Sequence, residues 1–159
     1  MEAPDVRISA KDKRQRLFRA PVWAHGAQDQ VMKRCLIVDD SSVIRQVAMR
    51  ILAGPDLLVA EAATAGETIE ICRDEMPDTI IVDYRLPDMD SCSLIAQLTS
   101  LDPNIKPRVL LCSSEFDAGL FTRAKRTGAS GYILKPFTRA QLLESFRSGE
   151  TITAAEEVF

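Results

Sequence analysis

Apolar runs of strand length alternate along the chain with stretches in which apolar residues recur every three or four positions. The runs lack polar alternation, which is typical of strands buried on both faces of a sheet. The periodic stretches have one apolar face each, which predicts amphipathic helices. The expected strands cover residues 34–38, 57–62, 79–83, 108–112 and 131–134. The expected helices cover residues 41–53, 91–100, 116–127 and 138–147, with one further helix that carries Ile69 and Cys72.

Capping and stop signals mark the ends of several of these helices. Thr64 is followed three residues later by Glu67, which predicts a capping box at the start of the second helix. Gly54-Pro55 and Gly128 are expected to end the first and fourth helices. Five strands that are each followed by a helix predict an α/β fold, in which helices cover both faces of one parallel sheet.

The two ends of the chain differ from this regular part. Residues 1–31 show neither period, and the segment 7–19 holds six basic residues and one acidic one. We expect a flexible basic extension, either simply solvated or in weak contact with an anionic surface or nucleic acid. Alternatively, Met32 is the natural start. The regular pattern covers residues 32–149, and residues 150–159 form a short acidic tail.

Composition and charge exclude several classes of protein. The chain has 159 residues, which is typical of one domain, and 46% of them are hydrophobic. Its net charge of −3 argues against a polycation built for nucleic acid. No apolar run approaches the roughly 20 residues needed to cross a bilayer, and no signal-peptide pattern is present. We therefore expect a cytoplasmic protein. The cysteines form no C-x-x-C pair and are expected to be buried thiols: Cys35, Cys72, Cys92 and Cys112.

Chemically competent side chains follow four of the predicted strands. Asp39 and Asp40 follow the first strand, Asp83 ends the third, Ser113 follows the fourth and Lys135 follows the fifth. In doubly wound sheets the functional site lies beyond the carboxyl ends of the strands. Three carboxylates gathered there would raise one another's pKa or hold a hard cation, and an oxygen-only ligand set suits Mg²⁺ or Mn²⁺.

A metal site with a spare carboxylate favours phosphoryl transfer. Asp83 would attack phosphorus and carry an acyl phosphate, while Mg²⁺ and Lys135 neutralise charge on the phosphoryl oxygens. The Ser113 hydroxyl would donate to one of these oxygens. A lone aspartate at a strand end is usually a helix cap, and a lone lysine is usually solvated. The functional interpretation therefore depends on their joint placement.

Four motifs resemble the receiver domain of bacterial response regulators, in particular the single-domain chemotaxis type. They read "IVDDSSVIR", "IIVDYRLPDMD", "VLLCSS" and "GASGYILKPFT". The intervals fit as well: Asp39 to Asp83 is 44 residues, Asp83 to Ser113 is 30, and Asp83 to Lys135 is 52. The resemblance covers about three quarters of the chain. It implies a flavodoxin-like sheet with strand order 2-1-3-4-5.

The resemblance also implies roles for the matching acids. Asp83 would be the phosphoacceptor. Asp40 would bind Mg²⁺ directly, Asp39 would act mainly through water, and Arg85 would offer its backbone carbonyl to the ion. Among the remaining site residues, Lys135 matches the lysine of the family.

Three further positions match the switch apparatus of the family. Ser113 corresponds to the switch hydroxyl, and Pro136 would follow a cis peptide bond, which is accessible before proline. Tyr132 matches the aromatic residue that swings inward when the hydroxyl moves, and the alternative is a half-buried strand tyrosine with no such role.

The sequence departs from the family at several positions near the site. Asp88 and Ser91 stand where the family often has glycine, so the loop after the third strand is expected to be stiffer or differently shaped. The switch hydroxyl is a serine rather than the commoner threonine. Arg85 and Glu115 lie two residues beyond Asp83 and the switch hydroxyl, and we expect them to pair across the mouth of the site and obstruct the hydrolytic water.

The functional prediction is a single-domain response regulator of a two-component phosphorelay. The only histidine, His25, precedes the receiver, so a histidine kinase or phosphotransfer protein must be the donor. The output is expected to be a downstream target protein bound on the face of residues 116–147. No membrane partner is expected, and nucleic acid is only the alternative given above for the basic extension. We expect a phosphoacceptor rather than an enzyme, and a monomer with a dimer as the alternative.

Two other classes of function remain as alternatives. The first is an interaction module with the receiver fold that works without phosphorylation. The second is a phosphatase or hydrolase with an aspartyl nucleophile. Such enzymes typically carry a second carboxylate two residues beyond the nucleophile, where this sequence has Arg85.

Overall fold

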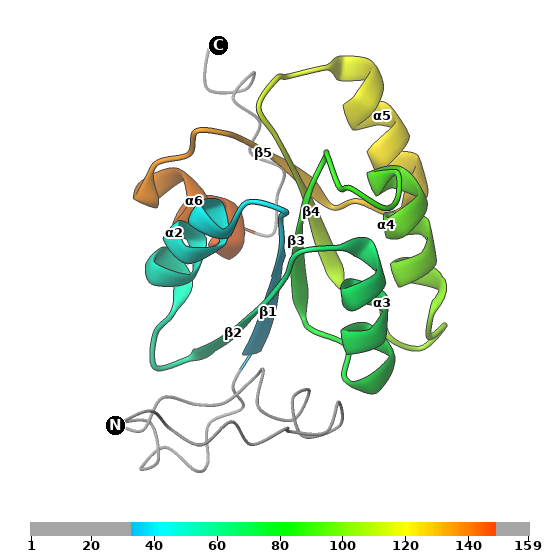
Figure 1. Ribbon diagram of the computed structural model, residues 1–159, viewed down its shortest axis with the longest axis horizontal. Coiled ribbons are helices and arrows are strands. Elements are labelled where there is room, and N and C mark those ends of the chain that lie inside the picture. Colours follow the sequence, from blue (N-terminus) through cyan, green and yellow to red (C-terminus); the bar gives the residue numbers. More distant parts are fainter. Residues whose placement is uncertain (1–32, 149–159) are drawn as a thin grey trace.

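A five-stranded parallel sheet organises the chain, with strand order β2-β1-β3-β4-β5 (Figure 1). The computed structural model describes residues 33–148. The strands are β1 (Lys33–Val38), β2 (Leu57–Ala62), β3 (Thr79–Asp83), β4 (Arg108–Ser113) and β5 (Gly131–Leu134). The helices are α2 (Ser42–Leu52), α3 (Ala65–Asp74), α4 (Ser91–Ser100), α5 (Ala118–Thr127) and α6 (Arg139–Ser148). The predicted fold class and strand order are confirmed.

Helices cover both faces of the sheet. Figure 1 shows α2 and α6 on one face, and α3, α4 and α5 on the other. Adjacent residues of β1 serve the two faces in turn: Cys35 and Ile37 pack toward α2 and α6, and Leu36 and Val38 pack toward α3, α4 and α5. All four are at most 2% exposed. This two-sided burial is the physical reason that the strands read as continuous apolar runs.

The register of the sheet brings the ends of neighbouring strands together. Val38 of β1 pairs with Ala62 of β2 and with Val82 of β3. Asp83 at the end of β3 pairs with Cys112 of β4. The residues that end β3 and β4 or directly follow β1 and β5 therefore share one edge of the sheet, which is where sequence reasoning expected the site.

Local capping explains most helix boundaries and one error in prediction. The helix expected over 116–127 begins at Ala118, because the Asp117 side chain accepts the N–H groups of Gly119 and Leu120 as an N-cap. At its other end Gly128 has φ of 120°, a conformation that favours glycine. A Cβ at this position would also lie 2.6 Å from the Thr99 side chain.

The predicted capping box of α3 is confirmed only in part. The Thr64 hydroxyl accepts the N–H of Glu67 at 3.1 Å, as expected. The return bond differs, since the Glu67 carboxylate accepts the N–H of Ala63 at 3.5 Å rather than that of the cap residue.

Other sequence predictions concern the cysteines and the chain ends. All four cysteines are buried and free, and burial raises the pKa of the Cys35, Cys72 and Cys112 thiols to about 12. The predicted basic extension, 1–31, and acidic tail, 150–159, lie outside the described residues. In the part of the chain that is described, no helix combines the length and apolarity that crossing a bilayer requires.

Candidate functional site

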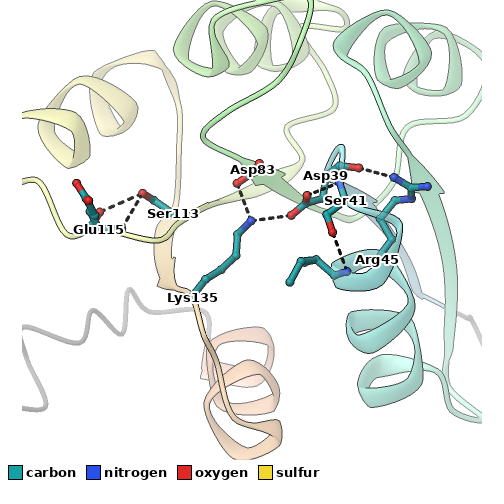
Figure 2. Close-up of polar contacts among 8 residues, drawn as sticks. Asp39, Ser41, Arg45, Asp83, Ser113, Glu115 and Lys135 are labelled. Carbon is teal, nitrogen blue, oxygen red and sulfur yellow. Dashed lines mark hydrogen bonds and ion pairs between the residues drawn. The ribbon is translucent and has the colours of Figure 1, made fainter.

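The Lys135 side chain joins two of the predicted acids. Its Nζ lies 2.8 Å from Asp39 Oδ2 and 2.8 Å from Asp83 Oδ1. Figure 2 shows the lysine reaching from the end of β5 to a point between the carboxylates that follow β1 and end β3. Asp39 and Asp83 are only 3% and 7% exposed, so this ion-pair network is largely shielded from water. The structure thus brings together side chains that lie up to 96 residues apart in sequence.

A third carboxylate completes an acidic cluster. Asp39, Asp40 and Asp83 each place a carboxylate oxygen within 4.8 Å of the others, and Asp40 is the exposed member. With all three acids ionised and Lys135 protonated, the cluster carries two excess negative charges. A divalent ion that prefers oxygen ligands fits both this charge and this donor set.

The turn between β1 and α2 holds Asp39 in place. Its Oδ1 accepts the backbone N–H of Ser41 at 2.9 Å, and Arg45 donates to its backbone carbonyl at 2.7 Å. Ser41 in turn caps α2 by accepting the N–H of Ile44. Sequence reasoning missed the role of Arg45, although this residue ends the first quoted motif. The Arg45 guanidinium also reaches Glu61 of β2, at 3.4 Å.

The environments of Asp83 and Lys135 shift both pKa values upward. Burial is the main cause that raises the pKa of Asp83, and the charges of Asp39 and Asp40 add to it, against the opposing effect of Lys135. Burial works against the charged form of Lys135, but its bonds to Asp39 and Asp83 together raise its pKa. The two pKa values can both rise because the ammonium of Lys135 is stabilised by two carboxylates. Asp83, in contrast, has to share this one cation with Asp39, so the ammonium does not offset the effect of burial.

The raised pKa of Asp83 predicts a pH dependence of stability. Because the folded protein binds this proton more tightly than the unfolded chain does, stability falls as pH rises from 3.8, the ordinary pKa of an aspartate, through the folded pKa. We expect Asp83→Asn to remove this fall and to raise the free energy of unfolding at neutral pH. Urea unfolding in EDTA from about pH 4 to about pH 8 measures the effect.

A matched control for this experiment is Asp56→Asn. Asp56 is exposed and precedes β2, at the opposite end of the sheet from the acidic cluster. Its substitution should leave the pH profile of the wild type intact. A wild-type profile that is flat across this range would show that the burial of Asp83 has no such energetic consequence.

Ser113 and Tyr132 meet at the backbone of Glu115. The Ser113 hydroxyl donates to the Glu115 carbonyl at 3.0 Å and accepts its N–H at 3.2 Å (Figure 2). The Tyr132 hydroxyl donates to the same carbonyl at 2.6 Å. Tyr132 is 1% exposed, and the rings of Phe116 and Phe121 contact it edge-on. The expected half burial of Tyr132 is therefore wrong, whereas its role as the switch aromatic stays a prediction. Burial raises the pKa of this phenol.

The expected pairing of Arg85 with Glu115 is not formed. Both residues are exposed and line the cavity together with Asp40, Asp83 and Ser113. Within residues 33–148, however, no ion pair within 4.0 Å joins the two side chains.

One further local prediction is confirmed, and the expected stiffer or differently shaped loop after β3 stays a prediction. The peptide bond between Lys135 and Pro136 is cis, as expected. Ser91, which stands where the family often has glycine, is fully buried as the first residue of α4. Asp88, the other such position, lies exposed in the preceding loop and contacts α3.

Comparison with known proteins identifies the class to which this fold and site belong. Residues 35–147 match the family described as the response regulator receiver domain. The chain is 33% identical over 115 residues to the chemotaxis protein CheY of Listeria monocytogenes, covering 72% of this chain and 95% of that protein. It is 32% identical over 114 residues to CheY of Thermotoga maritima, covering 71% and 93%.

Solved structures agree with the sequence comparison. A CheY-like receiver domain protein from Methanospirillum hungatei has 30% identity and a TM-score of 0.68, covering 74% of this chain and 93% of its own. CheY4 of Vibrio cholerae has 26% identity and a TM-score of 0.70, covering 74% and 98%. The chain belongs to the response regulator receiver domain family, whose CheY-like members are phosphoacceptors rather than conventional enzymes.

Proposed function

We propose that this protein is a single-domain response regulator that accepts a phosphoryl group on Asp83 and signals by binding another protein. The observation that carries this proposal is the ion-pair network at the carboxyl edge of the sheet, where Lys135 contacts both Asp83 and Asp39. The exposed Asp40 leaves the cluster accessible from the cavity. The donor would be a histidine kinase or a phosphotransfer protein, because the only histidine of the chain, His25, lies outside the described domain.

The chemistry begins with the Asp83 carboxylate as nucleophile. One of its oxygens forms a bond to phosphorus as the bond between phosphorus and the donor breaks, and the donor keeps that electron pair. Asp39, Asp40, Asp83 and the backbone carbonyl of Arg85 would hold Mg²⁺ or Mn²⁺, which supplies compensating charge to the phosphoryl oxygens when bound. Lys135 would transfer its hydrogen bond from Asp83 to a phosphoryl oxygen, since the acyl phosphate has less charge on the carboxyl oxygens.

The output would follow from competition for the Ser113 hydroxyl. A phosphoryl group adds about two negative charges at pH 7, which attract hydroxyl donors on the cavity wall. If Ser113 turned toward this group, its two bonds to Glu115 would break. The same Glu115 carbonyl accepts from Tyr132, so the inward position of that ring would be coupled to the hydroxyl. The face of residues 116–147 would then change its population of conformations.

The pathway is inferred from the relatives. The two CheY relatives named above are chemotaxis proteins, which supports a chemotaxis-type role for this chain. We propose that it acts in the cytoplasm as a monomer. Cell-cycle and stress signalling are the other pathways to test. Affinity capture with the phosphorylated protein, compared with an Asp83→Asn form, would identify both the donor and the target.

Incubation with acetyl phosphate and Mg²⁺, followed by intact mass measurement, tests the proposed function. The expected result is a mass gain of one phosphoryl group that disappears when EDTA replaces Mg²⁺. Absence of any gain would favour an interaction module that works without phosphorylation. Steady turnover of a phosphate monoester would instead favour a hydrolase.

Mg²⁺ is also expected to stabilise the folded protein. At about one hundred times its dissociation constant, a ligand that binds only the folded state adds about 2.7 kcal/mol to the free energy of unfolding. Asp40→Asn should remove most of this gain, because Asp40 supplies one of the three carboxylates. Unfolding with Mg²⁺ and with EDTA measures it, and Asp56→Asn is the control. An equal gain in Asp40→Asn would exclude this acid as a ligand.

A further inference from the structure

The loop between β3 and α4, residues 84–90, is hydrogen-bonded to the N-terminus of α3, which lies earlier in the sequence. Asp88 Oδ1 accepts the N–H of Ala65 at 2.9 Å, and Asp88 Oδ2 accepts the N–H of Gly66 at 3.0 Å. These are the first two residues of α3, more than 20 positions earlier in sequence. One carboxylate therefore satisfies two of the amides that a helix N-terminus leaves without partners.

The first turn of α3 thus has two separate caps. Thr64, its own N-cap residue, accepts the N–H of Glu67, and Asp88 accepts the two N–H groups before it. The bonds from Ala65 and Gly66 lower the pKa of Asp88, which means that they favour its ionised form. Negative charge is also favoured at the positive end of a helix dipole.

The other hydrogen bonds of the loop backbone lie toward β4 and α4. The N–H of Tyr84 donates to the carbonyl of Cys112 in β4 at 2.7 Å. Arg85 forms an isolated antiparallel bridge with Asp90, which also caps α4. These hydrogen bonds fix the loop to β4 and α4, while Leu86 and Met89 pack against the core cluster that α3 shares. Asp88 adds the hydrogen bonds that join the loop to α3.

The sheet order relates this attachment to β1, the strand that Asp39 and Asp40 follow. β1 lies between β2 and β3, and α3 follows β2 whereas the loop follows β3. A contact from the loop to α3 therefore spans the carboxyl end of β1, where Asp39 and Asp40 lie. Asp39 is tied to the same side, since its N–H donates to the carbonyl of Ala62 at the end of β2.

We propose that Asp88 is a positioning residue, which holds the backbone of Arg85 in register with Asp39 and Asp40 by fastening the loop 84–90 to the N-terminus of α3. This inference rests on the proposed function, because the Arg85 carbonyl in this loop is one of the proposed ligands of the divalent ion. A glycine, which the family often has here, offers no side chain for this contact. The attachment of the loop to α3 therefore requires the carboxylate that this chain carries at position 88.

Asp88→Ala and Thr64→Ala form a matched pair of variants for the test. Each removes one cap from the first turn of α3, but only Asp88→Ala releases the loop. Without metal, we expect amide hydrogen exchange in residues 84–90 to be about tenfold faster in Asp88→Ala and unchanged in Thr64→Ala. By calorimetric titration with Mg²⁺, Asp88→Ala should bind about tenfold more weakly, as for groups that orient metal ligands, and Thr64→Ala should bind like the wild type.

The outcomes separate this inference from the proposed function. Equal effects of the two variants on loop exchange and on Mg²⁺ binding would show that Asp88 only caps α3, which would overturn the positioning role. Unchanged loop exchange in Asp88→Ala would also overturn it. Failure of the wild type to bind Mg²⁺ or to accept a phosphoryl group would instead overturn the proposed function. The comparison of amide hydrogen exchange needs no metal, so it would still decide whether the contact of Asp88 with α3 fixes the loop.

Discussion

Asp83→Asn is expected to abolish the mass gain from acetyl phosphate and Mg²⁺. Asparagine preserves the size of the side chain and can still accept a hydrogen bond from Lys135, but it has no anionic oxygen to attack phosphorus. The loss would therefore be chemical rather than structural. Intact mass after a fixed incubation measures it, and a folded, stable Asp83→Asn protein makes the result interpretable.

The substitution of Asp83 also tests which acid of the cluster accepts the phosphoryl group. Asp39 has both carboxylate oxygens engaged, one by the N–H of Ser41 and one by Lys135, which leaves it less available as a nucleophile. Asp40 is exposed and is the rival acceptor. A phosphoryl gain that persists in Asp83→Asn and disappears in Asp40→Asn would move the acceptor to position 40. Asp56→Asn should behave as the wild type in every arm.

Lys135→Met is expected to lower the free energy of unfolding of the metal-free protein by about 3 kcal/mol at neutral pH. Removal of one partner from a buried ion pair typically costs this much. Asp39 and Asp83 would then lie close together in a poorly hydrated site without the ammonium that now contacts both. Because the folded pKa of Lys135 is raised, its stabilisation is complete at neutral pH and is lost only as pH rises through that folded pKa.

Mg²⁺ and acid should each reduce the defect of Lys135→Met. A bound divalent ion neutralises the same carboxylates, and acid protonates Asp83, whose pKa should rise further once the lysine is gone. Urea unfolding with and without Mg²⁺, at acidic and neutral pH, measures these effects. Phosphoryl uptake should fall about a hundredfold or more even with Mg²⁺ present, since a donor to the phosphoryl oxygens is lost.

The control for this variant is Lys106→Met. Lys106 is an exposed lysine that precedes β4, at the other end of the sheet. It should change neither stability nor phosphoryl uptake appreciably. A Lys135→Met protein as stable as Lys106→Met, in EDTA at neutral pH, would contradict the view that Asp39 and Asp83 depend on this ammonium.

The sequence alone determined the parts of this protein that depend on local pattern and on strand order. Each predicted strand is confirmed to within one residue, because burial on both faces leaves a continuous apolar run that is easily recognised. The gathering of Asp39, Asp40, Asp83 and Lys135 followed from the same pattern. In a parallel sheet the carboxyl ends of all strands share one edge, so residues that follow different strands are neighbours.

Only the tertiary structure decided contacts between segments that no local rule connects. The hydrogen bonds that Asp88 accepts from α3 depend on how the loop after β3 lies against a helix more than 20 residues earlier in sequence. The complete burial of Tyr132 depends on two aromatic rings that come from other elements. The separation of Arg85 from Glu115 depends on loop conformation rather than on spacing. Sequence spacing fixes which side chains can approach one another, whereas packing and hydrogen bonding in three dimensions decide which of them do.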